Sequence, residues 1–495
     1  MKGIRNIAGA LIAGLILSAC ATVPGGPRDY RAAKSALSEH IRVLASEDYG
    51  GRMPGTEGGA RTEQYLVDTL QRAGFEPGAR GGEWRQPVVL ARYSPGSASL
   101  GVLRDRTRVA LTGDQLVATG REASWKDLPA EYVHFGEGNL PEGALKGRAA
   151  VIPAARVREA FGALSGAAPD AIIVLAATQE EFDGLKPALE RGRWQLRDSG
   201  EEATRPAFVL VAPGGSAQLA ELWKIGQDSE GPMRVSQLPG ELSLSVSPKA
   251  ETIETHNVIG KLPGKVRDSG AVMILAHWDH LGTCGPADAP DRLCNGAVDN
   301  ASGIGVMLEV AKRVAAQGGL DRDLYVMGTT AEELGLLGAE AFAADPPFPL
   351  PTIVAAFNMD TVAIAPAGSP ATVVGWGRTP LDAHIRSVVE AAGTKFTVLE
   401  STEQFVRRQD GWALLSRDVP TVLVSTSFGD EKAFNAFLSG PYHGADDEWR
   451  ADLELGGATD DIFLHVALLK HFGSVARYQP GATPAAKSVP GDPEG

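Results

Sequence analysis

The stretch 271–280, Ala-Val-Met-Ile-Leu-Ala-His-Trp-Asp-His, decides the fold. Its first six residues are apolar, which is typical of a strand buried on both faces of a sheet, and two imidazoles and a carboxylate follow at once. Similar apolar runs and amphipathic helical stretches alternate downstream. The expected strands are 324–327, 353–357 and 421–424, and the expected helices are 304–316, 381–392 and 462–472. This alternation predicts an α/β fold, with a mixed, largely parallel sheet sandwiched by helices.

The rest of the chain is organised around that sheet. Helical spacing at 34–46 and 57–73 precedes it, whereas 97–250 contains short β-type runs, one expected helix at 215–225 and no cluster of His and carboxylates. This middle block predicts an inserted, β-rich accessory domain. The expected order is a tether at 20–33, a first part of the main domain at 34–96, the insertion at 97–250, a catalytic part at 251–478 and a disordered Pro/Gly/Ala-rich tail at 479–495.

The first 19 residues have the pattern of an export signal. Lys2 and Arg5 precede an apolar run of 11 residues at 7–17, whereas a membrane-spanning helix needs about 20. The run ends in Leu-Ser-Ala-Cys20, which resembles the lipobox of bacterial lipoproteins. That resemblance implies cleavage before Cys20, lipid on its thiol, and an exported protein anchored to a bacterial membrane. The alternative is an ordinary secretory signal with an incidental cysteine.

Composition excludes several classes of protein. The chain has 495 residues, is 43% apolar and carries 47 Lys and Arg against 61 Asp and Glu, for a net charge of −14. The apolar content excludes disorder for most of the chain, and the acidic balance argues against nucleic-acid binding.

The two remaining cysteines, Cys284 and Cys294, predict a disulfide in an exported protein. A thiolate metal site is the alternative, but no C-x-x-C spacing supports it.

Residues of metal-ligand type follow the expected strands. They are His277, Asp279, Asp299, Glu332, Glu333, Asp360 and His443. Each has an ordinary explanation alone, such as a helix N-cap for Asp299. Together they crowd one edge of one sheet, where the repulsion between carboxylates would be costly without cations.

A count of formal charges predicts two cations. Two divalent ions bring four positive charges, which three carboxylates and one hydroxide balance while two imidazoles stay neutral. A mixture of His and carboxylate ligands suits Zn²⁺, so the sequence predicts two Zn²⁺ per chain.

Five motifs carry a family resemblance. They are His277-Trp-Asp-His, Ala297-Val-Asp-Asn-Ala-Ser-Gly, Glu332-Glu-Leu-Gly-Leu-Leu-Gly, Asn358-Met-Asp and Tyr442-His443. Jointly they resemble the M28 family of dinuclear zinc peptidases, which includes secreted bacterial aminopeptidases. The resemblance covers about 253–475 and extends to 34–95, and the insertion resembles a protease-associated domain.

The resemblance implies a role for each residue of the site. Asp299 would bridge both zinc ions, with His277 and Asp360 completing one site and Glu333 and His443 the other. Glu332 would be the general base acting on a metal-bridging water.

Three further residues would assist these ligands. Asp279 would hold His277 in the correct tautomer. Asp447, or else Asp446, would support His443. Tyr442 would donate to the tetrahedral oxyanion, with simple packing as the alternative.

The expected function is therefore that of a zinc-dependent exopeptidase, favouring an aminopeptidase, with peptides as substrates. A metallocarboxypeptidase or dipeptidase of the same fold is the alternative and needs a basic group for the substrate carboxylate. The candidates for that group are Arg378, Arg407 and Arg408. Glutaminyl cyclase, which uses one zinc, is disfavoured because the five-ligand set is complete. A non-catalytic ectodomain is disfavoured because no ligand or base is lost.

Overall fold

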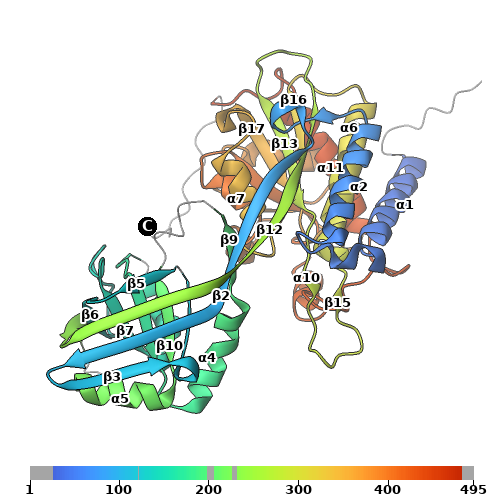
Figure 1. Ribbon diagram of the computed structural model, residues 1–495. Coiled ribbons are helices and arrows are strands. Elements are labelled where there is room, and N and C mark those ends of the chain that lie inside the picture. The colour runs from blue at the N-terminus through green and yellow to red at the C-terminus, as the bar shows by residue number, and fades with distance from the viewer. Residues whose placement is uncertain (1–25, 121, 165, 198–205, 226–230, 482–495) are drawn as a thin grey trace, which may run out of the picture.

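The computed structural model describes residues 26–120, 122–164, 166–197, 206–225 and 231–481. The predicted signal peptide, the lipidation residue Cys20 and the tail from residue 482 on lie outside these described residues. The described chain forms two units, one built on an 11-stranded sheet and one on a 6-stranded sheet. In Figure 1 a pair of long strands runs from one unit into the other.

Four neighbouring parallel strands form the centre of the larger sheet, in the order β19-β17-β13-β16. Their bounds are Ala271–His277 for β13, Asp323–Thr329 for β16, Ile353–Asn358 for β17 and Thr421–Ser425 for β19. β12 (Glu241–Leu262) pairs antiparallel with β16, and β18 (Thr372–Val374) pairs antiparallel with β19. The mixed sheet that the apolar runs predicted is therefore confirmed. Only its four central strands are parallel, and its other pairings are antiparallel.

Helices cover both faces of this sheet because alternate residues of each strand point to opposite sides. Val272, Ile274 and Ala276 of β13 belong to one fully buried core, and Met273 and Leu275 belong to another. The first core includes residues of α1 (Pro27–Leu44), α2 (Glu57–Arg72), α6 (Gly303–Ala316), α8 (Asp382–Ala391) and α11 (Gly456–Phe472). The second includes residues of α7 (Leu337–Ala344) and α9 (Gly411–Leu415). Burial of each large aliphatic side chain contributes roughly 1.5–3 kcal/mol to folding.

The first helix begins earlier than the sequence indicated. α1 starts at Pro27, so residues 27–33, expected to be part of a tether, are helical. Proline suits the first turn of a helix, and Asp29 in that turn forms an ion pair with Arg313 of α6 at 2.6 Å. The tether is thus shorter than the composition of this segment suggested.

The smaller unit has more helix than predicted. Its sheet has the order β11-β6-β7-β8-β10-β4, and β6, β7, β8 and β10 are parallel to one another. The strands are β4 (Leu116–Thr119), β6 (Ala130–His134), β7 (Ala149–Pro153), β8 (Ala171–Leu175), β10 (Ala207–Val211) and β11 (Arg234–Leu238). The helices are α3 (Val157–Leu164), α4 (Gln179–Arg191) and α5 (Pro213–Trp223). The hydroxyl of Thr178 accepts a backbone N–H at the start of α4, a helix that the sequence reading missed.

Two long strands connect the units. β2 (Arg85–Arg104) pairs antiparallel with β12 from Leu103 opposite Glu241 to Arg85 opposite Val258. At one end β12 joins the larger sheet through β16, and at the other end Leu100 and Leu244 pack into the core of the smaller sheet. The expected domain boundaries, residues 97 and 250, therefore fall inside these two strands (Figure 1).

The predicted disulfide is confirmed. Cys284 and Cys294 are bonded across the β14–β15 hairpin (Gly282–Thr283 and Leu293–Cys294). Among the described helices, none combines the length and the apolar character that crossing a membrane requires.

Candidate metal centre

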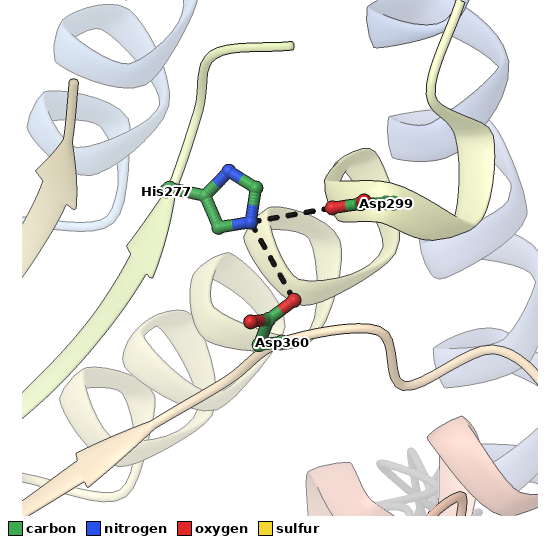
Figure 2. A group of neighbouring side chains, drawn as sticks. All are labelled: His277, Asp299 and Asp360. Atoms are coloured by element: carbon green, nitrogen blue, oxygen red, sulfur yellow. Dashed lines mark ion pairs between the residues drawn. The ribbon is translucent and has the colours of Figure 1, made fainter. Parts of the chain in front are cut away.

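Asp299 lies between two pairs of potential metal ligands. The Nε2 atom of His277 is 3.3 Å from Oδ1 of Asp299 and 3.5 Å from Oδ1 of Asp360 (Figure 2). On the other side, the Nε2 atom of His443 is 3.3 Å from Oδ2 of Asp299 and 3.1 Å from Oε2 of Glu333. The two oxygens of one carboxylate thus face two separate sets of donors. The structure brings together all five residues that the sequence singled out as ligands.

Strand order explains why these residues meet. His277 is the last residue of β13, Asp360 follows β17, and Glu333 follows β16. Because these three parallel strands are neighbours, their carboxyl ends share one edge of the sheet. Asp299 belongs to the turn Ala297–Ser302 that leads into α6, and the peptide bond after it is cis.

A sixth donor at this centre was missed by the sequence reading. The Nδ1 atom of His280 lies 2.6 Å from Oε1 of Glu333, and its Nε2 atom is buried without a hydrogen-bond partner in the described chain. Donor atoms of His280, Asp299 and Glu333 lie within 4.8 Å of one another, as do those of His277, Asp299 and Asp360. The only sequence signal was its place as the fourth residue of the motif that begins at His277.

Two buried aspartates accept hydrogen bonds from the backbone of the segments that carry the expected ligands. The carboxylate of Asp447 accepts the backbone N–H groups of Val298 and Asp299 at 2.9 and 3.0 Å. The carboxylate of Asp279 accepts those of Glu332 and Glu333 at 3.1 and 3.3 Å. Two consecutive N–H groups match the two oxygens of a carboxylate, and these bonds compensate its loss of hydration.

These contacts correct two expected roles. Asp447 supports Asp299 and not His443. The Asp279 carboxylate lies 3.9 Å from Nδ1 of His277, beyond hydrogen-bond distance, and the backbone oxygen of Asp279 lies closer, at 3.2 Å. The backbone oxygen of Asp279 is therefore the group placed to accept the Nδ1 proton of His277. The Asp279 carboxylate already accepts hydrogen bonds from the loop after β16.

The electrostatics of the site fit cations. Burial alone would lower the pKa of His443, but hydrogen bonds to Asp299 and Glu333 raise it to about 10. The pKa of His277 is likewise raised well above its usual value, because the neighbouring carboxylates outweigh its burial. Both imidazoles therefore lie in a strongly negative potential. Imidazole nitrogens and carboxylate oxygens that converge in such a potential fit divalent metal ions such as Zn²⁺.

Glu332 differs from Glu333 in its surroundings. Burial, with the charges of Asp410 and Asp360, raises the pKa of Glu332 well above its usual value. Glu333, by contrast, has a lowered pKa, because the hydrogen bonds from His280 and His443 outweigh its burial. A carboxyl with a raised pKa suits proton transfer, and one with a lowered pKa suits metal binding. This contrast is compatible with the roles that the resemblance implied for the two glutamates, and those roles stay a prediction.

Asp410 and Tyr442 line the same region. Asp410 is fully buried, accepts a hydrogen bond from the hydroxyl of Thr329, and burial raises its pKa to about 7. The ring of Tyr442 stacks on His443, with centroids 3.8 Å apart and planes at 23°. Packing is thus one role of Tyr442, and its donation to an oxyanion stays a prediction.

Comparisons with known proteins agree with this chemistry. Residues 257–467 match the model of Peptidase family M28. A curated relative, the vacuolar membrane protease of Yarrowia lipolytica, is 37% identical over 101 residues, which is 20% of this chain and only 9% of that protein's length.

Solved structures give weaker likenesses. An aminopeptidase from Aneurinibacillus sp. strain AM-1 is 17% identical with a TM-score of 0.47, and covers 88% of this chain and 93% of its own. A zinc aminopeptidase from Bacillus subtilis is 16% identical with a TM-score of 0.46, and the match covers 91% of this chain and 96% of that chain. A peptidase M28 precursor from Shewanella amazonensis SB2B is 17% identical with a TM-score of 0.46, and the match covers 92% of this chain and 97% of that chain. The family match supports the expected enzyme class, a metallo-exopeptidase. All five expected ligands lie within residues 257–467, the stretch that matches the model of Peptidase family M28.

Proposed function

We propose that this chain is a zinc-dependent aminopeptidase that binds two Zn²⁺ and removes N-terminal residues from peptides. The observation that carries the proposal is the position of Asp299, whose two oxygens each face a separate His–carboxylate pair. A carboxylate shared in this way suits a pair of neighbouring metal ions, because each of its oxygens can bind one of them. His277 and Asp360 would hold one ion, Glu333 and His443 the other, and Asp299 both.

Zn²⁺ held by these residues would supply Lewis acidity to polarise the scissile carbonyl and to acidify a water molecule. The protein groups do the remaining work. Glu332 would take a proton from the attacking water and pass it to the leaving amine, and burial, which raises the pKa of its carboxyl, suits it to hold the proton between these two transfers. Asp279 fixes the backbone N–H groups of Glu332 and Glu333, so that the base and its neighbouring ligand keep their relative position. The free α-amine of the substrate would meet the carboxylates of Glu332 and Asp360.

Export and a lipid anchor at Cys20 are part of this proposal. The signal-like sequence at 1–19 supports them, and so does the Cys284–Cys294 disulfide, because such bonds persist mainly in oxidising compartments. The smaller unit at the far end of β2 and β12 would be the protease-associated-like part.

The direct test is a panel of substrates with and without a chelator. We expect hydrolysis of aminoacyl-p-nitroanilides, little hydrolysis of the same compounds with a blocked amine, loss of activity with the chelator and recovery with added zinc. Activity confined to N-blocked substrates would refute the aminopeptidase and favour the carboxypeptidase. Full activity of metal-free protein, verified by elemental analysis, would refute the metal centre.

A further inference from the structure

A pocket opens beside the metal centre. It contains about 360 Å³ of empty space, part of it open to solvent, and Asp360 and Tyr442 form the end nearest to the expected ligands. Its other lining residues are Thr361, Phe405, Arg408, Gln409, Phe428, Phe434 and Leu438. A partly open pocket that begins at a metal ligand is placed to receive a side chain of the substrate whose peptide bond lies at the metals.

One side of the pocket is a fixed aromatic wall. The ring centroids of Phe428 and Phe434 are 4.2 Å apart, and the ring of Phe405 lies 5.5 and 5.3 Å from them in an edge-on arrangement. Phe428 and Phe434 belong to a buried apolar cluster, so the wall is supported from behind. It suits the hydrocarbon part of a substrate side chain.

Arg408 gives the pocket its only positive charge, since Asp360 is the other charged lining residue and is engaged with His277. Its guanidinium carbon lies 5.4 Å from the ring centroid of Phe405, so the cation rests against the aromatic wall. In the described part of the chain no carboxylate pairs with it. The polar groups next to it are already used: Gln409 bonds to the backbone of Val406 and Gly411.

The other two arginines considered as carboxylate binders are engaged elsewhere. Arg378 forms an ion pair with Glu403, and the guanidinium of Arg407 lies 4.9 Å from the ring of Trp412, outside the pocket lining. Of the three, only Arg408 combines a place in the pocket with a guanidinium that has no carboxylate partner.

We propose that Arg408 determines specificity by binding a carboxylate of the substrate, and that this enzyme favours peptides whose N-terminal residue is acidic over those with the uncharged analogue. The inference rests on the proposed function and specifies its substrate class. The carboxylate is that of the N-terminal side chain, because the pocket begins at Asp360, where the proposed function places the α-amine of the substrate, and a side chain departs from the carbon next to that amine. A glutamyl side chain places its methylenes against the phenylalanines and its charge at Arg408.

The experiment compares kcat/KM for Glu-, Gln- and Leu-p-nitroanilide in the zinc-loaded full-length protein. The variants are Arg408→Gln, Arg408→Lys and, as a matched control, Arg407→Gln. We expect the wild type to favour Glu over Gln by about fivefold, as for a partly exposed charge pair in a pocket. Arg408→Gln should bring this ratio to about one, Arg408→Lys should retain part of it, and Arg407→Gln should leave it unchanged. The rate with Leu-p-nitroanilide should change less than about twofold in Arg407→Gln, and circular dichroism spectra that match the wild type show that all three variants fold.

Two results would overturn the inference while leaving the aminopeptidase intact. One is an unchanged Glu/Gln ratio in Arg408→Gln with normal hydrolysis of Leu-p-nitroanilide. The other is a loss, in the same variant, of preference for Leu-Gly over Leu-Gly-amide, which would assign Arg408 to a C-terminal carboxylate and favour the dipeptidase. Failure of the wild type to hydrolyse any of the three anilides would instead overturn the proposed function and the inference together.

Discussion

The imidazole of His280 and the carboxylate of Glu333 form a 2.6 Å hydrogen bond that leaves the second oxygen of Glu333 3.1 Å from His443. Glu333 is thereby held between two imidazoles, one from the loop after β13 and one from the loop after α10 (Glu431–Leu438). A ligand fixed in this way loses little freedom when it binds a metal ion.

The first prediction concerns this hydrogen bond. His280→Ala should weaken zinc binding by about 10- to 100-fold, as is typical when a residue that orients a metal ligand is removed. Competition with a chromogenic chelator measures the affinity. His134→Ala, in β6 of the smaller sheet, serves as the control and should bind zinc normally. Unchanged zinc affinity in His280→Ala would show that Glu333 needs no such support.

The second prediction separates the two adjacent glutamates. Glu332→Ala should keep its zinc content and lose about 10²- to 10⁴-fold in kcat, because it removes the proton acceptor only. Glu333→Ala should lose zinc. Elemental analysis together with kinetics on one aminoacyl anilide checks both variants. The opposite pattern would mean that the two roles are exchanged.

The third prediction tests the support of Asp299. Asp447→Asn replaces one of two accepting oxygens by an amide, which leaves the N–H of Val298 or Asp299 buried without an acceptor. We expect a loss of about 1–3 kcal/mol in the free energy of unfolding, seen as a lower melting temperature of the metal-free protein. Asp446→Asn is a suitable control because Asp446 is exposed. Equal stability of both variants would contradict the role assigned to Asp447.

The fourth prediction concerns pH and a carboxyl away from the metal ligands. Burial raises the pKa of Asp461 to about 8, although Ser425 and Thr426 donate hydrogen bonds to it. The folded protein therefore keeps this proton up to about pH 8, whereas the unfolded chain releases it near pH 4. Unfolding releases a proton in that window, so this group's contribution to stability is greatest at low pH and falls as the pH rises.

The measurement is the difference in the free energy of unfolding between wild type and Asp461→Asn. Between pH 5 and pH 8 the free energy of unfolding of the wild type should fall, relative to that of Asp461→Asn, by up to about 1.4 kcal/mol per pH unit. Asp460→Asn, at the neighbouring and less buried position, provides the comparison. A pH-independent difference for Asp461→Asn would show that the carboxyl titrates normally.

The sequence could predict that the expected ligands converge because three of them, His277, Glu333 and Asp360, follow neighbouring parallel strands. Apolar runs such as 271–276 are unambiguous, and the order of parallel strands brings their ends together whatever the details of the loops. The partners of the ligands were not predictable in the same way. The choice of Asp447 between Asp299 and His443, and the contact between His280 and Glu333, depend on loop geometry that no local pattern encodes.

The long strands were missed for a physical reason. β2 contains Pro95-Gly96 and β12 contains Pro248, residues that normally indicate turns. In the structure these positions oppose one another at a change of register between Ser247 and Lys249, so that one irregularity accommodates both prolines. These Pro and Gly residues therefore led to domain boundaries at positions where the chain in fact continues as a β-strand.

The continuity of β2 and β12 has a practical consequence for anyone who wishes to produce the metal-binding half alone. A deletion of residues 97–250 would cut both strands and remove part of their pairing. A short turn that joins Leu103 directly to Glu241 would keep all pairs between β2 and β12, because those two residues already lie opposite each other. The shortened protein would then expose the apolar residues of β2 and β12 that the removed segment now shields, namely Leu100, Val102, Leu242, Leu244 and Val246. These positions would have to be made polar to keep it from aggregating.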